Sequence, residues 1–540
     1  MRRSQKIHGI EASTPRTAAE KAAQLITAVL KSVEQAKQLK NPNVRVALED
    51  ISVIKSLGDY CSSIEGLTAG DLERFVGKFW ERGSQLPGWE PFIQNVDTTV
   101  FYGGRSDSIF WENGKGLLAS FPTAHNFPSE FMNGKKILGK NGLRITQMRS
   151  LPITLYSGEV FGKSGATVVP DDLSHLPAIW CFCSSPEYSE AVRRIDQKLN
   201  VTNATLVKVP FDLAHWAKVA QEKYPNGLPK PSSDDPIQWL FHGHPAQSDA
   251  PLQVAVARLL GYRWPAEQDS SMELSDDARV WVKKSEALLA HADDDGIVCI
   301  PAVRGEKPAA DRLRELLAAA YGQNWSPAIQ EELLAAASFS GKTLENWLRD
   351  GFFDQHCKLF HQRPFIWHVW DGRRDGFSAL VNYHKLDRRQ LEKLTYTYLG
   401  DWIKRQEDSL ARDEGGVEAR LLAAHELQNK LKLILEGEPP YGIFVRWKPM
   451  EQQPIGWEPD LNDGVRLNVR PFVTADILRK RPSIKWGQDR GKNPPGSPWG
   501  EERINDRHLT LAEKTGYAIE NRVRPPKGEV TSCMLYNRCR

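Results

Sequence analysis

The feature that most constrains the fold of this chain is a change in hydrophobic period. Between about residues 98 and 170, apolar and polar residues alternate in short runs separated by Gly, Asn and Pro, beginning with Thr98–Gly104. That pattern is typical of strands joined by tight turns. On either side, apolar residues recur every three or four positions, as in Thr17–Lys40 and across 252–350, which is typical of helices. Together the two periods predict an α+β fold.

The chain has 540 residues, which is more than one ordinary domain needs. Changes in pattern divide it into four expected parts: a helical segment over 1–60, a β-rich module over 61–235, a mainly helical spacer over 236–355 and a mixed α/β, loop-rich region over 356–540. In the last part, Phe365–Asp371 and Phe377–Lys385 form the clearest predicted hairpin. A long helix is expected to begin near Asp387 and another at Val417.

The net charge is only +3, so any nucleic-acid footprint must be local. Residues 101–170 hold eight Lys and Arg against four Asp and Glu, and residues 463–540 hold sixteen against nine. Two basic regions separated by a mixed one fit a partner that is held at two places. Seven scattered cysteines, an odd number, favour a reducing cytoplasm over a disulfide framework. We expect a cytoplasmic protein with no membrane partner, because no apolar run approaches the length of a membrane span.

The most distinctive basic stretch is Phe131–Ser157, with five cations and no acid. Its glycines allow close backbone approach to phosphates, and Arg and Gln are the side chains that contact guanine and adenine through paired hydrogen bonds. The spacing alone favours a solvated surface hairpin over a nucleic-acid contact. The candidate residues for nucleic-acid contact in this stretch are Lys135, Lys136, Lys140, Arg144, Thr146, Gln147 and Arg149.

A second candidate is the pair Arg373 and Arg374 at the tip of the predicted hairpin. An exposed turn would project both guanidinium groups outward, where they could contact phosphates. A charged turn that only aids solubility explains the pair equally well.

No assembled catalytic or cofactor site is visible in the sequence. Gly162–Gly165 is glycine-rich but has no helix after it, as a phosphate-binding turn would require. Asn493-Pro494-Pro495 precedes Gly496 rather than an aromatic ring, so it lacks the stacking group of an amino-methyltransferase loop. The densest thiol–imidazole cluster, around His356 and Cys357, lies among aromatic residues and favours a packed core over a metal site. We therefore expect no catalytic residue, cofactor site or metal site in this chain.

Several long stretches resemble a known family. Gly66–Phe75, Leu176–Phe211, Arg363–Arg405 and Gly456–Arg470 resemble the C-terminal part of large bacterial adenine-specific DNA methyltransferases. These are the fused type II restriction–modification enzymes of the G and L kinds and the related methyltransferases of phage-exclusion (BREX-like) systems. The resemblance runs over about residues 20–515.

The resemblance implies a DNA target-recognition part whose catalytic domain would precede residue 1, so that residues 1–60 would be the tail of that domain. It implies double-stranded DNA as partner and S-adenosylmethionine as cofactor of the complete enzyme, with none bound by this chain. Lys135, Lys136 and Lys140 would then contact phosphates, and Arg144, Gln147 and Arg149 would contact bases. Two alternatives stay open: a subunit that works with a separately encoded catalytic chain, and a folded remnant without activity.

Overall fold

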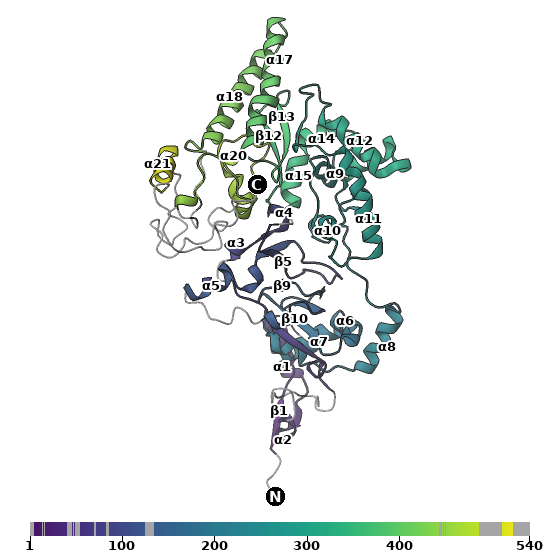
Figure 1. The fold of residues 1–540 in the computed structure, drawn as a ribbon. Coiled ribbons are helices and arrows are strands. Elements are labelled where there is room, and N and C mark those ends of the chain that lie inside the picture. The colour runs from purple at the N-terminus through teal and green to yellow at the C-terminus, as the bar shows by residue number, and fades with distance from the viewer. Residues whose placement is uncertain are drawn as a thin grey trace. The chain divides into compact units, whose positions relative to one another are not determined.

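The computed structural model describes residues 5–12, 15, 17–39, 46, 48, 55–69, 72–82, 86–124, 134–441, 445, 448, 450–484 and 510–521. Helices and several small antiparallel sheets occur along these residues, so the predicted α+β fold class is confirmed (Figure 1). The chain forms two compact units: unit 1 comprises Met1–Thr68, Gln94–Gly103 and Met132–Pro229, and unit 2 comprises Ala69–Ile93, Gly104–Phe131 and Lys230–Arg540.

The predicted division into four parts stays a prediction. Residues 69–93 and 104–131, which the sequence pattern groups with the β-rich module, pack in unit 2. The border between Pro229 and Lys230 lies close to the expected end of that module at residue 235.

The centre of unit 1 is an antiparallel sheet with strand order β3-β10-β7-β8. Its strands are β3 (Cys61–Glu65), β7 (Gly142–Thr146), β8 (Ile153–Tyr156) and β10 (Gly165–Pro170). Strands β7, β8 and β10 confirm the strand-rich region that the sequence predicts between residues 98 and 170. The run Thr98–Gly104 was predicted as a strand and forms none. Its backbone instead bonds beside β8, where Val100 N–H donates to the Ile153 carbonyl over 3.1 Å.

Three helices pack against this sheet to form the core of unit 1. They are α6 (Leu176–Cys183), α7 (Pro186–Ile195) and α8 (Leu213–Lys223) (Figure 1). Side-chain caps fix two of their starts, because Ser185 accepts from the Tyr188 N–H and Asp212 from the His215 N–H. Along β7, Leu143 and Ile145 face this core. The residue between them must then point to the opposite face of the sheet.

The N-terminal segment differs from the long helix predicted over Thr17–Lys40. Helix α1 (Ala18–Thr27) begins at a capping box formed by Thr17 and Glu20. The chain then extends into β2 (Lys31–Glu34), which pairs antiparallel with β1 (Lys6–Gly9), and ends in the short helix α2 (Gln35–Gln38). Pairing with β1 gives the backbone an alternative to further helical turns that the hydrophobic period alone does not reveal.

In the described residues of unit 2, strands pair antiparallel in two places. In one, β13 (Ser378–Asn382) lies between β11 (Ile297–Cys299) and β12 (Ile366–Trp370), which confirms the predicted hairpin. In the other, β6 (Asp107–Phe110) pairs with both β4 (Val76–Lys78) and β5 (Trp89–Ile93).

Helices make up most of the rest of unit 2. The longest ones are α9 (Pro251–Leu259), α11 (Asp276–Ala287), α12 (Ala309–Tyr321), α13 (Pro327–Ala336), α17 (Leu399–Ala411), α18 (Val417–Glu436) and α21 (Leu511–Asn521). The shorter ones are α3 (Leu72–Phe75), α4 (Phe79–Arg82), α5 (Leu117–Ala124), α10 (Pro265–Gln268), α14 (Leu344–Asp350), α15 (Phe352–Leu359), α16 (Arg388–Glu392), α19 (Val465–Asn468) and α20 (Arg470–Thr474). The predicted long helix near Asp387 is α16 continued through a π-helical turn, Lys393–Tyr398, into α17. Helix α18 runs beside α17 (Figure 1).

A buried ionic network joins distant segments of unit 2. The carboxylate of Glu81 is fully buried; it lies 3.7 Å from Nη1 of Arg82 and 3.6 Å from Nε of Arg363. It also accepts from the Lys78 N–H over 2.9 Å. Burial by itself would raise the pKa of Glu81, but the positive charges of Arg466, Arg82 and Arg363 outweigh burial and lower the pKa to about 2. Glu81 is therefore ionised at neutral pH and compensates the surrounding guanidinium groups.

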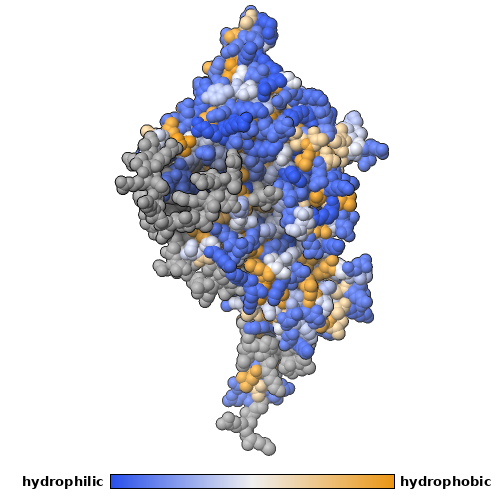
Figure 2. All heavy atoms as spheres, viewed as in Figure 1, coloured by the Kyte–Doolittle hydropathy of each residue, from blue (hydrophilic) through white to orange (hydrophobic). Residues whose placement is uncertain are grey.

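The surface of the described residues is mostly hydrophilic. Figure 2 shows polar residues over most of the coloured surface and apolar residues in small scattered groups. Among the helices of the described residues, none combines the length and apolar character that crossing a bilayer requires.

We expect Glu81→Gln to lower the free energy of unfolding at pH 7 by roughly 3 to 5 kcal/mol, because it leaves buried guanidinium groups uncompensated. The pKa of Glu81 is lower in the folded state than its ordinary value of 4.5. The stabilisation is therefore complete above that value and declines as the pH falls toward 2. Urea unfolding at pH 7, 5 and 3 should show the gap between wild type and variant narrowing as the pH falls.

The matched control is Glu315→Gln, which removes an exposed carboxylate paired with Lys307. An exposed pair contributes at most about 1 kcal/mol, so this variant should unfold nearly as wild type does. Equal destabilisation by the two variants would contradict a special role for the buried carboxylate.

Candidate nucleic-acid interface

The predicted contact residues of unit 1 lie along β7 and the turns at its two ends. Before the strand, Lys135, Lys136 and Lys140 are all exposed, on a segment we call the lysine turn (residues 135–140). Its end is held by backbone contact, because the Gly139 N–H donates to the Gly158 carbonyl over 2.9 Å. A Cβ on Gly158 would stand 2.5 Å from the Cα of Gly139. Only glycine at position 158 allows this approach, which holds the backbone at the end of the lysine turn.

Arg144 occupies the middle of β7 and is fully buried. Its guanidinium group donates to the carbonyls of Gly165 and Gly162, over 2.9 and 2.7 Å. In the sheet it lies between Thr167 and Thr154, the two residues paired with it on β10 and β8. Burial lowers its pKa to about 9, which leaves it charged at neutral pH. A base contact by Arg144 stays a prediction, and this placement favours a structural role instead.

Thr146 and Gln147 follow at the end of the strand. The Thr146 hydroxyl donates to the carbonyl of Val96 over 2.8 Å, and the side chain is half-buried. Gln147 is buried, and its carbonyl accepts from the Val201 N–H over 2.9 Å. Both residues therefore hold the end of β7 against neighbouring chain segments, and neither presents its side chain freely to solvent.

Arg149 lies on the turn between β7 and β8 (residues 147–152) and is largely exposed. Its Nη1 is 2.7 Å from Oδ1 of Asp97, and both side chains are open to solvent. Such an ion pair is weak and screened by salt, so a phosphate can compete for the guanidinium group. Arg149 and Leu151 both have positive φ, near +57° and +59°. A non-glycine residue in that region needs outside support.

Arg193 supplies part of that support and belongs to a cation cluster that sequence reasoning missed. Its Nη2 donates to the Arg149 carbonyl over 2.7 Å from the last turn of α7. Arg194 and Lys198 are exposed next to it in the chain. The dipeptide Arg193-Arg194 is visible in the sequence, but its position beside the β7–β8 turn depends on a contact 44 residues apart.

Among the predicted contact residues of unit 1, the exposed cations thus form two groups at opposite ends of β7. The lysine turn precedes Gly142, and Arg149 follows Thr146. Five residues of strand span about 17 Å, so the two groups can engage separate phosphates but cannot crowd around one.

The two arginines predicted at the hairpin tip of unit 2, Arg373 and Arg374, make different contacts. Arg373 forms a two-point contact with Asp375, with nitrogen–oxygen distances of 3.0 and 3.1 Å. Arg374 is 80% exposed, and its Nε is 3.7 Å from Oδ1 of Asp350. Of the two arginines at this hairpin tip, Arg374 is therefore the more accessible for a contact with phosphate.

Metal-ligand arrangements are absent from the described residues: no group of three His, Cys, Asp or Glu side chains could hold an ion there. His356 is buried and hydrogen-bonded on both ring nitrogens, to Gln253 and to the Ile366 N–H. Its role in the described structure is packing within the core of unit 2.

Comparison with known proteins gives one partial likeness and no family assignment. No known family profile matches the chain. Over 129 residues it is 26% identical to the adenine-specific methyltransferase PglX of Lacticaseibacillus casei (strain Zhang). That stretch covers 22% of this chain and 10% of the relative, so the match spans about a tenth of the relative's length. The likeness supports a relationship to methyltransferase-related proteins.

Arg144→Ala should lower the free energy of unfolding by about 3 kcal/mol, because it leaves buried carbonyls without their charged donor. Arg149→Ala removes an equal charge from an exposed pair and should cost less than about 1 kcal/mol. Urea titrations of the two variants and the wild type give the comparison. Similar stability of the two variants would show that the guanidinium group of Arg144 has no structural role.

Proposed function

We propose that this chain is the DNA target-recognition part of a site-specific N6-adenine DNA methyltransferase that serves restriction–modification or phage defence. In this proposal it binds duplex DNA and does not transfer methyl groups by itself. The likeness to an adenine-specific methyltransferase supports the class of protein. The observation that carries the DNA-binding role is the pair of exposed cation groups at the two ends of β7.

The lysine turn suits phosphate contact better than base contact. Ammonium groups act as point charges without the paired geometry that distinguishes one base from another. The backbone at the end of the turn is held by the contact between Gly139 and Gly158, so DNA binding would mainly have to order the lysine side chains.

In the same proposal, the β7–β8 turn is suited to recognising bases. Arg149 carries a guanidinium fork, the commonest specific contact to guanine. Its backbone is held by Arg193, so the fork is presented from a fixed base rather than from a loose loop. The exposed side chains of Arg194 and Lys198 would add phosphate contacts beside it.

The lysine turn can be tested by salt dependence. Replacing Lys135, Lys136 and Lys140 together by Gln should weaken duplex binding and make the slope of log affinity against log salt shallower by about 2.7, since each phosphate contact contributes about 0.9. Fluorescence anisotropy of a labelled duplex at several salt concentrations measures both quantities.

A variant of equal charge change provides the control: Lys55, Lys218 and Lys223, all exposed in unit 1, replaced together by Gln. This control should keep the wild-type slope. If the two triple variants change the slope equally, binding follows net charge and the lysine turn is not the contact surface.

A second candidate function is that of a subunit completed by a separately encoded catalytic chain. The observation that favours it is an apolar group on α1 and just after it, where Ile26 is 85% and Val29 82% exposed. Leu25 and Leu30 are more than half exposed beside them. A cluster of exposed apolar side chains on one short segment marks a protein-contact surface.

That candidate is tested by methyl transfer from labelled S-adenosylmethionine to duplex DNA. We expect no transfer by the purified chain, and transfer after the addition of a methyltransferase chain encoded beside its gene. Ile26→Asp with Val29→Asp should then abolish the restored activity, whereas Leu199→Asp, at an exposed apolar residue elsewhere in unit 1, should not. Methylation by the purified chain alone would contradict both candidate functions.

A further inference from the structure

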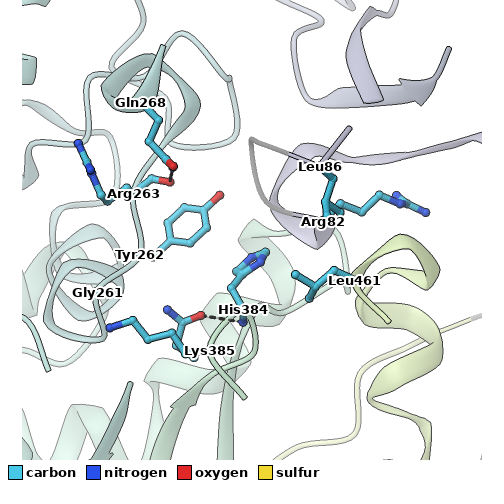
Figure 3. Close-up of a pocket in the computed structure, with 10 residues that line it drawn as sticks. Arg82, Leu86, Gly261, Tyr262, Arg263, Gln268, His384, Lys385 and Leu461 are labelled. Carbon is cyan, nitrogen blue, oxygen red and sulfur yellow. Dashed lines mark hydrogen bonds between the residues drawn. The ribbon is translucent and has the colours of Figure 1, made fainter. Parts of the chain in front are cut away.

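Unit 2 contains a cavity of about 310 Å³ that no predicted site residue lines. Its wall includes the rings of Tyr262 and His384, the side chains of Leu86 and Leu461, and the amide of Gln268 (Figure 3). The volume lies at the lower end of the range for small-molecule sites in proteins. It suits one ring system rather than a long ligand.

Tyr262 supplies an unused polar group. The residue is only 5% exposed, yet its hydroxyl has no hydrogen-bond partner in the described part of the chain. In Figure 3 this hydroxyl points into the cavity. The ring is held in place by Phe365 and Trp264, with centroids 4.2 and 4.9 Å away. Burial raises the pKa of Tyr262, so the group stays a neutral O–H donor.

His384 supplies a complementary acceptor. Its Nε2–H donates to the Trp80 carbonyl over 2.8 Å, because a carbonyl can only accept. Burial lowers the pKa of His384 to about 4, so the ring is neutral at physiological pH. With the proton on Nε2, Nδ1 carries a lone pair, and no described residue donates to it. Its ring centroid lies 5.3 Å from that of Tyr262.

Each cation around the cavity donates a hydrogen bond to a backbone carbonyl. Lys385 Nζ donates to the Asp293 carbonyl over 2.8 Å, Arg263 Nη2 to the Glu267 carbonyl over 3.2 Å, and Arg82 Nε to the Asn462 carbonyl over 3.2 Å. Figure 3 shows their charged ends pointing away from the Tyr262 hydroxyl and the His384 ring. The cavity therefore offers a neutral donor and a neutral acceptor between apolar walls, which suits an uncharged ring and not a phosphate.

We propose that this cavity binds a single nucleobase. The edge of a base places a hydrogen-bond donor next to an acceptor. For adenine, the His384 Nδ1 accepts from the exocyclic amine and the Tyr262 hydroxyl donates to the neighbouring ring nitrogen. Leu86 and Leu461, which lie across the cavity from Tyr262 in Figure 3, supply apolar contacts to the ring. The base can come from a free nucleoside or from an unpaired position in DNA, since both present the same edge.

Isothermal titration of the full chain with adenosine tests the site without DNA. Wild type should bind adenosine, and Tyr262→Phe, which removes only the hydroxyl, should weaken binding about tenfold. Tyr396→Phe, at an exposed tyrosine of unit 2, should bind as wild type does. Purine riboside, which lacks the amine, should bind more weakly than adenosine, and ribose 5-phosphate should not bind.

Equal binding of adenosine by Tyr262→Phe and wild type, with unchanged circular dichroism, would overturn the proposal. So would the absence of adenosine binding at millimolar concentration, or binding of ribose 5-phosphate as tight as that of adenosine. Displacement of adenosine by a duplex with one unpaired adenine assigns the base to DNA, and no displacement by it assigns the base to a free nucleoside. Because the adenosine titration uses no DNA, it can fail while duplex binding at the lysine turn succeeds, and the reverse.

Discussion

The buried carboxylate of Glu81 is the interaction on which unit 2 most depends. A charge inside a protein is tolerated only when opposite charges and hydrogen bonds compensate it. Here the compensating groups come from Arg363 and Arg466, nearly three hundred residues or more away in the sequence. The same junction carries the bond from the Trp80 indole to the Arg363 carbonyl and the bond from His384 to Trp80. His384, in the wall of the cavity, is thus hydrogen-bonded to Trp80, the residue next to Glu81 in the chain.

The elements that the sequence predicted well are those with local causes. The β12–β13 hairpin and helix α18 follow from a period, a turn and a cap that all lie within a few residues. The helix predicted over Thr17–Lys40 ends at Thr27 because β2 finds a partner in β1. Whether a segment pairs with another strand depends on residues elsewhere in the chain, and the hydrophobic period of the segment itself does not show it.

In the candidate interface, too, features with local causes could be predicted and features that depend on distant residues could not. The exposure of the lysine turn could be expected from its charge and glycines. For Arg144, the alternation of Leu143 and Ile145 places the side chain on the second face of the sheet, but only the structure shows that the carbonyls of Gly162 and Gly165 cover it there. The cavity site was invisible in the sequence, since Tyr262 and His384 are brought together across more than a hundred residues.

Each unit is assembled from three separate segments, so the chain passes between the units five times. A recombination event with one crossover in the gene could therefore not exchange unit 1 for a homologous unit without also replacing pieces of unit 2. Surface properties of unit 1 would instead change by substitution on exposed turns, such as residues 147–152, while the three segments of each unit are inherited together.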